Sequence, residues 1–295
     1  MTATSRRHLP LLLLAGALTV LSGFAGPGAS QAQAQSSEWA GKKLVVGIHN
    51  RTPWAYRDKD SKVVGIHPDV IRAVFAPLGV KDFEFVVSDF GAMIPGLLAG
   101  RFDIIASGVA ITPPRCEQVL FSEPDVAVGD SLLVKKGNPL KLHSYEDIAK
   151  NPKVRLAGGR GSENTKNAIA AGVPESQISL FPNNEAAVSA ILADRADVTT
   201  LSVPSAIGVI DEQKVEGIER AVPFKGLIKP NGQPAKLYTG TVFPKGSAKL
   251  RDAYNAQLAK LRASGGLKPI MEKYNFTADE DAGQVTTAQI CTGNG

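Results

Sequence analysis

One arginine of this sequence stands where a small anion is readily held. Arg115 comes just past a predicted strand, and ligands bind at strand ends in α/β sheets. A guanidinium there can grip a carboxylate through two parallel hydrogen bonds. The alternative is a surface arginine that pairs with Glu117 or Glu123. The residues alone leave both interpretations open.

Two aromatic residues also follow predicted strands. Trp54 lies in the loop after the first strand, and Phe90 lies in the loop after the second. We therefore expect both rings to face a cleft at the strand ends, where an aromatic face attracts a ligand cation. Filling of the core is the commoner role of such side chains and stays the alternative.

A glycine-rich loop precedes a predicted helix at residues 163–171. Residues 158–162 read Gly-Gly-Arg-Gly-Ser, and free N–H groups at such a helix start can bind an anion. A plain turn is the alternative. The loop lacks the Lys-Ser/Thr pair and the glycine spacing of a nucleotide phosphate loop. It also lacks the Gly-x-Ser-x-Gly pattern of a nucleophile elbow.

Strands and helices alternate along the first half of the chain. This order is typical of βαβ units and indicates the α/β class. Proline near the start of the first helix and glycine after it fit helix boundaries. The predicted strands are residues 43–48, 82–87 and 103–107, and the predicted helices are residues 68–78 and 92–99.

A short internal repeat suggests two lobes that are built alike. Residues 97–104, Leu-Leu-Ala-Gly-Arg-Phe-Asp-Ile, are echoed by residues 191–198, Ile-Leu-Ala-Asp-Arg-Ala-Asp-Val. Chance similarity is the alternative. Extended segments at 130–136 and 238–243 would cross between the lobes, and two crossings allow a cleft to open and close. A long helix is predicted at 248–263.

The first residues resemble an export signal. Arg6 and Arg7 precede an apolar stretch at residues 11–20, and Ala-Gln-Ala at 32–34 offers a cleavage site. The apolar stretch is shorter than the ~20 residues that span a bilayer. We therefore predict a signal peptide at residues 1–34, with a permanent anchor as the alternative. The Sec and twin-arginine routes both stay open.

The composition is that of a globular protein, with 43% hydrophobic and 21% charged residues and a formal net charge of +5. No basic run is present, so we expect no nucleic-acid partner. Two cysteines and four histidines form no metal-ligand pattern, so we expect neither metal nor cofactor. In an oxidising compartment Cys116 and Cys291 would favour a disulfide, with two free thiols as the alternative.

Residues 97–125 contain a composite motif, whose pieces are Gly100-Arg101-x-Asp103, Ser107-Gly108, Ile111-Thr112-Pro113-x-Arg115 and Phe121-Ser122-Glu123-Pro124. This motif resembles the signature of family 3 extracellular solute-binding proteins, the polar-amino-acid type, and the resemblance extends from about residue 42 to residue 276. Residues 90–97, 135–140 and 172–174 resemble most the ectoine- and hydroxyectoine-binding branch of that family.

This resemblance implies a type II periplasmic-binding-protein fold, in which two α/β lobes are joined by two crossing strands around a ligand cleft. Lobe 1 would comprise residues 38–133 and 241–295, and lobe 2 residues 134–240. The implied function is that of a monomeric periplasmic protein that captures a small polar, carboxylate-bearing solute. It would hand the solute to the permease of an ABC importer.

The resemblance also assigns residues to the cleft, although the sequence departs from the family there. Ser202 stands where amino-acid binders usually place an aspartate for the ammonium group. Compared with the ectoine binders, Arg51 replaces an acid and Ala110 replaces an aromatic residue. We expect a preference shifted away from ectoine if Arg51 points into the cleft, and pointing into solvent is the alternative. The implied binding residues are Arg51, Trp54, Phe90, Gly108, Ala110, Arg115, Gly161, Ser162 and Ser202.

Two rival functions stay open. The first is an enzyme of the same fold, similar to the cyclohexadienyl dehydratases, which would need a placed acid or base. Glu163, His49 and Asp89 are the candidates, but they make no evident constellation. The second is an accessory protein of a dehydrogenase or a sensor kinase. We expect a binding protein and no enzyme.

Overall fold

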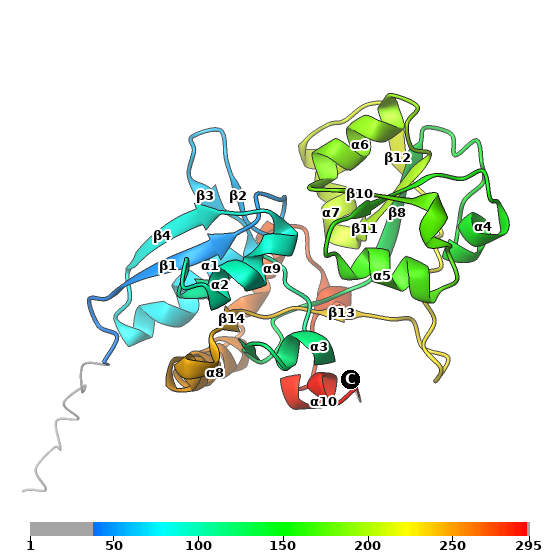
Figure 1. Ribbon diagram of the computed structural model, residues 1–295. Helices are drawn as coiled ribbons and strands as arrows, with labels where there is room; N and C mark the ends of the chain where they lie inside the picture. The colour runs from blue at the N-terminus through cyan, green and yellow to red at the C-terminus, as the bar shows by residue number, and fades with distance from the viewer. Residues whose placement is uncertain (1–37, 294–295) are drawn as a thin grey trace, which may run out of the picture. The chain divides into compact units, whose positions relative to one another are not determined.

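The computed structural model describes residues 38–293, which contain two lobes, each built on a five-stranded mixed sheet (Figure 1). The predicted α/β class is therefore confirmed. The predicted signal peptide lies outside the described residues. In sheet order, the first lobe has β4 (Asp82–Val87), β1 (Lys43–Ile48), β5 (Ile104–Ile105), β14 (Val242–Phe243) and β6 (Leu120–Phe121).

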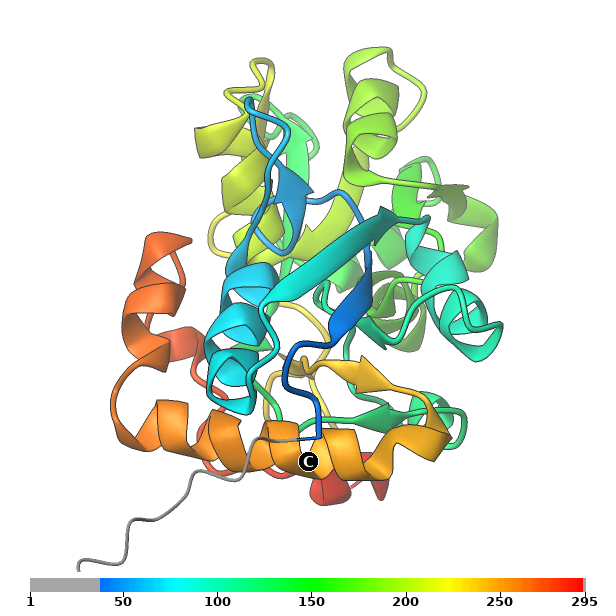
Figure 2. The same ribbon diagram turned by 90° about the vertical axis from the view of Figure 1, so that its left-hand side faces the viewer.

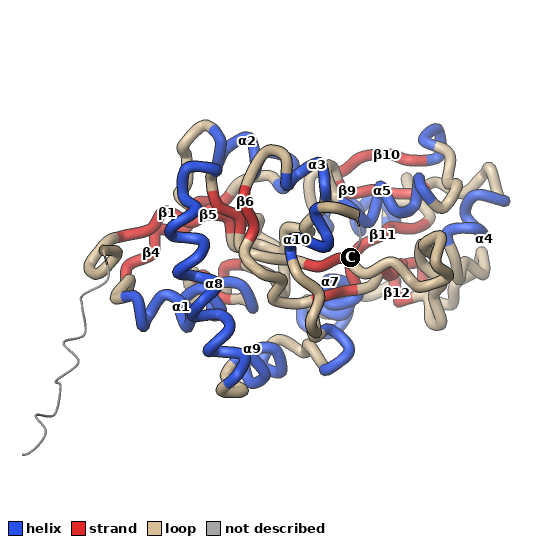
Figure 3. Tube along the Cα trace, turned by 90° about the horizontal axis from the view of Figure 1, so that it is seen from below, coloured by secondary structure: helices blue, strands red, loops and turns tan. Residues whose placement is uncertain are grey.

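Helices cover both faces of the first sheet because alternate residues of β1 point to opposite sides. Leu44, Val46 and Ile48 pack into the core under α1, α8 and α9, whereas Val45 packs toward α2 and α3. Figure 3 shows these two groups of helices on opposite sides of the strands. The helices of this lobe are α1 (Ile66–Phe75), α2 (Met93–Leu98), α3 (Pro113–Cys116), α8 (Ala248–Ala263), α9 (Leu267–Lys273) and α10 (Thr287–Cys291).

The second lobe repeats this layering. On its strand β8, which lies between β11 and β12, Leu132 and Val134 pack toward α4 and α5, whereas Leu133 packs toward α6 and α7. In sheet order its strands are β10 (Ile178–Phe181), β9 (Leu156–Gly159), β11 (Val198–Ser202), β8 (Asp130–Lys135) and β12 (Ile218–Arg220). Its helices are α4 (Tyr145–Lys150), α5 (Glu163–Ala170), α6 (Asn184–Leu192) and α7 (Val203–Ile207).

A two-stranded antiparallel sheet, β7 (Ala127–Val128) with β13 (Leu237–Tyr238), connects the lobes. The prediction that residues 130–136 form a crossing was wrong, because β8 is a full member of the second sheet. The predicted lobe boundary after residue 133 consequently falls inside β8. A central strand and a crossing strand are both extended and apolar, so the local pattern does not distinguish them.

The long helix α8 has the predicted bounds, and Figure 2 shows it in orange along one edge of the first lobe. The internal repeat also has the predicted setting, because its two copies end α2 and α6 and lead into β5 and β11. Strand β5 is shorter than predicted. A small hairpin of β2 (Tyr56–Arg57) and β3 (Val63–Val64) completes the first lobe. No helix within residues 38–293 has the length and apolar character needed to cross a membrane.

Candidate ligand-binding site

The residues predicted to bind ligand converge on one small cavity between the lobes. They follow the carboxyl ends of β1, β4, β5, β9 and β11, which is where α/β sheets bind ligands. The cavity volume is about 20 Å³, which is room for about one water molecule. It is lined by Arg51, Trp54, Phe90, Gly108, Ala110, Arg115, Val128, Ser162, Glu163, Asn164, Ser202, Leu237 and Thr239.

Arg115 reaches from α3 across to the second lobe. Its Nη1 donates to the carbonyl oxygen of Ala110 at 2.7 Å, and its Nη2 donates to that of Gly161 at 2.9 Å. The same Nη2 lies 3.3 Å from Oε1 of Glu163. Burial lowers the pKa of Arg115 and the Glu163 charge raises it in part. The carboxylate partner is therefore Glu163 of the opposite lobe, not the neighbouring Glu117 or Glu123.

Arg51 points into the cavity and lies against the two predicted aromatic walls. Its guanidinium carbon is 5.5 Å from the ring centre of Trp54 and 5.1 Å from that of Phe90. Its buried Nε has no hydrogen-bond partner among residues 38–293. Burial lowers the pKa of Arg51 to about 10, so the group stays cationic at neutral pH. The place expected for a ligand cation is therefore taken by a side chain of the protein.

Trp54 serves both as core and as cavity wall. Its side chain is buried among the residues under the first sheet, and its ring makes edge contacts with His67 and Phe276. Its Nε1 donates across the lobes to Oγ of Ser205 at 2.9 Å. Ser202 donates to the same oxygen at 3.0 Å. The two interpretations of this tryptophan are thus compatible.

Two glycines allow close approach at the cavity. Gly108 has φ +67°, and a Cβ there would lie 2.5 Å from the Trp54 ring and 3.0 Å from Nη2 of Arg51. Gly161 has φ +73°, and a Cβ there would lie 3.0 Å from Cα of Gly91 in the other lobe. A side chain at either position would be strained and crowded. Both glycines therefore let the walls come together.

The glycine loop before α5 presents a different backbone group from the one expected. The N–H of Ser162 donates to the carbonyl of Gly159 at 3.1 Å, so it closes the turn. The carbonyl of Gly161 faces Arg115. Gly161 is also the one predicted binding residue that does not line the cavity. An anion-binding role for these two amides stays a prediction.

Two hydrogen-bonded networks, one buried and one partly buried, contact residues that line the cavity, and neither was predicted. Thr239 lines the cavity and donates to Oδ1 of Asp125 at 2.6 Å. Oδ2 of Asp125 lies 3.2 Å from Nε2 of His67, whose Nδ1 accepts from the amide of Gly108 at 2.9 Å. This network joins the return crossing to the cavity-lining Gly108. Its members are far apart in the sequence, so no local pattern announces them.

The second network lies at the start of β8. Asp130 accepts from Nδ2 of Asn164 at 2.6 Å and from Nδ2 of Asn167 at 3.0 Å. Burial raises the pKa of Asp130 from 3.8 to about 6, although these hydrogen bonds act in the opposite direction. Asn164 lines the cavity, so this carboxyl group positions a cavity residue.

Of the three candidate acids and bases, only Glu163 lines the cavity. His49 lies behind Phe90, its Nδ1 is 3.1 Å from the Ser88 carbonyl, and burial lowers its pKa to about 4. Asp89 is exposed just before the turn that carries Phe90. Within the described residues no cluster of histidine, cysteine and acidic groups could hold a metal ion.

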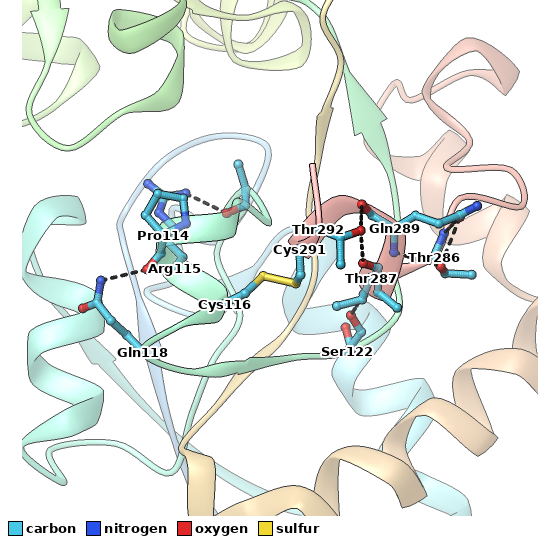
Figure 4. The surroundings of a disulfide bond; sticks show 12 residues. Pro114, Arg115, Cys116, Gln118, Ser122, Thr286, Thr287, Gln289, Cys291 and Thr292 are labelled. Atoms are coloured by element: carbon cyan, nitrogen blue, oxygen red, sulfur yellow. Dashed lines mark hydrogen bonds between the residues drawn. A yellow bond between two sulfur atoms is a disulfide. The ribbon is translucent and has the colours of Figure 1, made fainter. Parts of the chain in front are cut away.

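The predicted disulfide is confirmed: Cys116 and Cys291 are bonded with an S–S distance of 2.00 Å. Figure 4 shows that it joins α3, which carries Arg115, to α10 at the C-terminal end. Thr287 adds a hydrogen bond from its N–H to Glu123 Oε2 at 2.9 Å. The C-terminal tail therefore braces the element that positions Arg115.

A larger hollow of about 890 Å³ lies between α8, α9 and residues 276–286. It contains none of the predicted binding residues. Charges on its rim pair with one another, with Arg262 3.5 Å from Asp281 and Lys268 3.7 Å from Glu272. The size of this hollow does not by itself indicate a ligand. The cavity between the lobes, which the predicted binding residues line, is therefore the better candidate site.

The fold and the cavity are typical of a two-lobed binding protein, with the cavity lined by residues of both lobes. The model of bacterial extracellular solute-binding proteins, family 3, matches residues 44–278, so the chain belongs to this family. A probable amino-acid ABC transporter periplasmic-binding protein of Sinorhizobium fredii is 33% identical over 290 residues, which cover 97% of this chain and 95% of the relative.

Two solved structures illustrate the similarity. The crystal structure of EhuB in complex with hydroxyectoine has a TM-score of 0.76 and 36% identity, covering 84% of this chain and 94% of that chain. An ancestral amino acid-binding protein, described as a precursor of cyclohexadienyl dehydratase, has a TM-score of 0.68 and 29% identity, covering 79% and 95%. The predicted family and two-lobed type II fold are thereby confirmed.

Proposed function

We propose that this protein is the periplasmic solute-binding component of an ABC importer and captures a small polar solute that carries a carboxylate. The observation that carries the proposal is Arg115, a cavity-lining guanidinium of one lobe that contacts Gly161 and Glu163 of the other. The relatives named for amino-acid transport and the hydroxyectoine complex support this class of solute. An amino acid, an amino-acid derivative and an ectoine-like solute all fit it.

The mechanism is closure of the lobes around the solute. A cavity of about 20 Å³ is too small for an amino acid, so the lobes part to admit the solute. A solute that contacts both lobes stabilises the closed form relative to the open form, which is the differential affinity that a conformational change requires. The permease would then recognise the closed form.

The remaining assignments belong to the same proposal. Residues 1–34 direct export and are removed, the mature protein works in the periplasm as a monomer, and the lobes meet near the crossing strands β7 and β13. The ligand-binding residues are those that line the cavity together with the Gly161 loop. The partners are the solute and the membrane permease.

A binding role is favoured over the enzyme alternative by the ion pairs of Glu163, the acid in the cavity. Oε1 of Glu163 lies 3.3 Å from Arg115 and 2.8 Å from Lys166, so this oxygen is already engaged by two cations of the protein itself. The ancestral relative of the dehydratases is itself described as an amino acid-binding protein. Incubation with candidate solutes, followed by mass spectrometry, should return them unchanged.

The experiment that tests the proposal is a thermal-shift screen of amino acids, ectoines and small carboxylates. A solute at 100 times its dissociation constant adds roughly 2.7 kcal/mol to the stability of the folded state. Arg115→Ala should abolish the shift, whereas Arg101→Ala, at an exposed position of the same lobe, should retain it. A shift that both variants retain would place the solute elsewhere.

A further inference from the structure

Three charged side chains line the cavity within the described residues, and they suggest a narrower solute class. Arg51 and Arg115 are cationic, and Glu163 is anionic. Glu163 lies beside Arg115, so the charge of Arg51 is the one without a compensating carboxylate in the cavity. This inference rests on the proposed function and concerns the same site.

Arg51 is held in place but not neutralised. The faces of Trp54 and Phe90 orient its guanidinium, and its Nε lacks a hydrogen-bond partner among the described residues. The one acid that raises its pKa is Glu185, an exposed residue at the start of α6. Buried donors are nearly always satisfied in folded proteins. An anionic group of the solute would supply both the missing hydrogen-bond acceptor and the missing negative charge.

Among the described residues, Glu163 brings the one carboxylate to the cavity, whereas Ser202 brings only a hydroxyl group. Ser202 ends β11 with a hydroxyl group, which donates to Ser205. Glu163 starts α5, its side chain is only 11% exposed, and it faces the same cavity. A carboxylate there can accept from an ammonium group once a solute carboxylate takes its place on Arg115, because Lys166 still balances it from the rim.

We propose that the solute is an amino dicarboxylate, that is, a small molecule with two carboxylates and one ammonium group. One carboxylate pairs with Arg115, the second pairs with Arg51, and the ammonium group pairs with Glu163. The three charges of the solute then mirror the three charges of the cavity. Trp54 and Phe90 orient Arg51 and do not hold a cation of the solute.

Simpler solutes leave one charge of the cavity without a partner. Ectoine has one carboxylate and a delocalised cation, which would face Arg51 in a cavity from which water is excluded. A neutral side-chain amide would leave Arg51 without an anion. A dicarboxylate that lacks the amine would bring two anions toward Glu163. A mismatch of charges of this kind weakens the binding of these simpler solutes.

The test is calorimetric titration of the mature protein with matched probes. We expect L-glutamate or L-aspartate to bind at least roughly tenfold more tightly than L-glutamine, glutarate and ectoine, since a charge-assisted pair in a closed site is worth a tenfold change or more. Glutamine differs from glutamate only in the side-chain carboxylate, which is an amide in glutamine. Glutarate differs from glutamate only in lacking the amino group.

Two variants separate the roles of the side chains. Arg51→Gln should reduce the preference for glutamate over glutamine to about threefold or less, and Glu163→Gln should do the same for glutamate over glutarate. Arg101→Gln is the control and should change neither ratio. Circular dichroism checks that each variant is folded.

Tighter binding of glutamine, glutarate or ectoine than of both acidic amino acids would overturn this inference and leave the solute-binding proposal standing. The same holds if Arg51→Gln leaves the ratio of glutamate to glutamine unchanged. Failure of glutamate and aspartate to bind at millimolar concentration also overturns it. Failure of every solute in the wider thermal-shift screen would count against the proposed function itself.

Discussion

The two arginines of the cavity are held in opposite ways. Arg115 has two backbone carbonyls and a carboxylate around it, two of these three partners coming from the other lobe. Arg51 is held by the faces of two aromatic rings, and its Nε has no hydrogen-bond partner within residues 38–293. The first arginine links the lobes in the closed form. The second has no carboxylate beside it in the cavity, so an anionic group of the solute can pair with it. Arg51 is therefore the better candidate for the residue that selects among solutes.

The largest expected effect concerns the bracing of Arg115. Replacing Cys116 and Cys291 by serine removes a link between residues 175 positions apart, and the chain-entropy model gives up to about 5 kcal/mol of lost stability. Denaturant unfolding measures the loss. Because α3 carries Arg115 and the Arg51 loop has no such link, we expect weaker solute binding as well. A double variant with unchanged stability and affinity would show that the tail does not brace the site.

Loss of Arg115 itself should cost the next largest amount. Arg115→Ala removes a charge-assisted pair from a closed site, so affinity for the identified solute should fall by roughly 2–5 kcal/mol. Arg115→Lys should also bind poorly, since a point charge cannot replace the planar fork. Calorimetry provides the measurement, with Arg101→Ala as control. Affinity near that of the wild type in the alanine variant would remove Arg115 from the site.

The network behind the cavity gives a pH dependence of stability. The pKa of Asp130 is raised from 3.8 to about 6 by burial, so folding favours its protonated form. Asp130 contributes on the order of 3 kcal/mol to the free energy of unfolding. This contribution is fully present below pH 4 and is lost as the pH rises through about 6. We expect the free energy of unfolding of the wild type, relative to Asp130→Asn, to fall over this window. A constant difference from pH 4 to pH 7 would contradict the raised pKa.

His49 changes the free energy of unfolding with pH in the opposite direction to Asp130, so the wild type must be compared with a variant. Burial lowers its pKa from 6.5 to about 4, so its contribution is present above pH 6.5 and is lost as the pH falls toward 4. The wild-type curve alone would mix the two effects. The difference between wild type and Asp130→Asn isolates the carboxyl group, because both proteins keep His49.

The smallest expected effect concerns Ala110 and ectoine. Ala110 offers no aromatic face, so roughly 0.5–2 kcal/mol of cation–π attraction is absent at this position, and Arg51 adds repulsion of a cation. We expect ectoine and hydroxyectoine to bind no more tightly than micromolar and Arg51→Glu to strengthen them. Titration of both compounds into the two proteins is the check. Submicromolar binding to the wild type would show that the aromatic wall outweighs Arg51.

The sequence predicts the layers of this protein better than its connections. Strand β1 and helix α8 have the predicted bounds, because long periodic segments follow local patterns. The first crossing was placed too late, since β8 is extended and apolar like any crossing strand. Whether a strand is central or crosses between lobes depends on partners that lie far away in the chain.

The site shows the same division. The strand-end rule and the family motif identify most cavity residues, including Arg115 and Phe90. They do not reveal that Glu163 is the partner of Arg115, because that contact joins the two lobes. The direction of Arg51 likewise depends on the tertiary placement of Phe90, whose ring centre lies 5.1 Å from the guanidinium carbon. Contacts of this kind follow from packing between distant segments and carry no local signal.

The fluorescence of Trp54 can report directly on closure of the lobes around a solute. The sequence has two tryptophans, Trp39 and Trp54, and Trp54 lines the cavity. In a Trp39→Phe variant the fluorescence therefore comes from the cavity wall alone. We expect a saturable, one-to-one change in this fluorescence with the solute that calorimetry identifies, and no change when Arg115→Ala is added. Tight binding by calorimetry without any change in Trp54 fluorescence, and undiminished by Arg115→Ala, would contradict it.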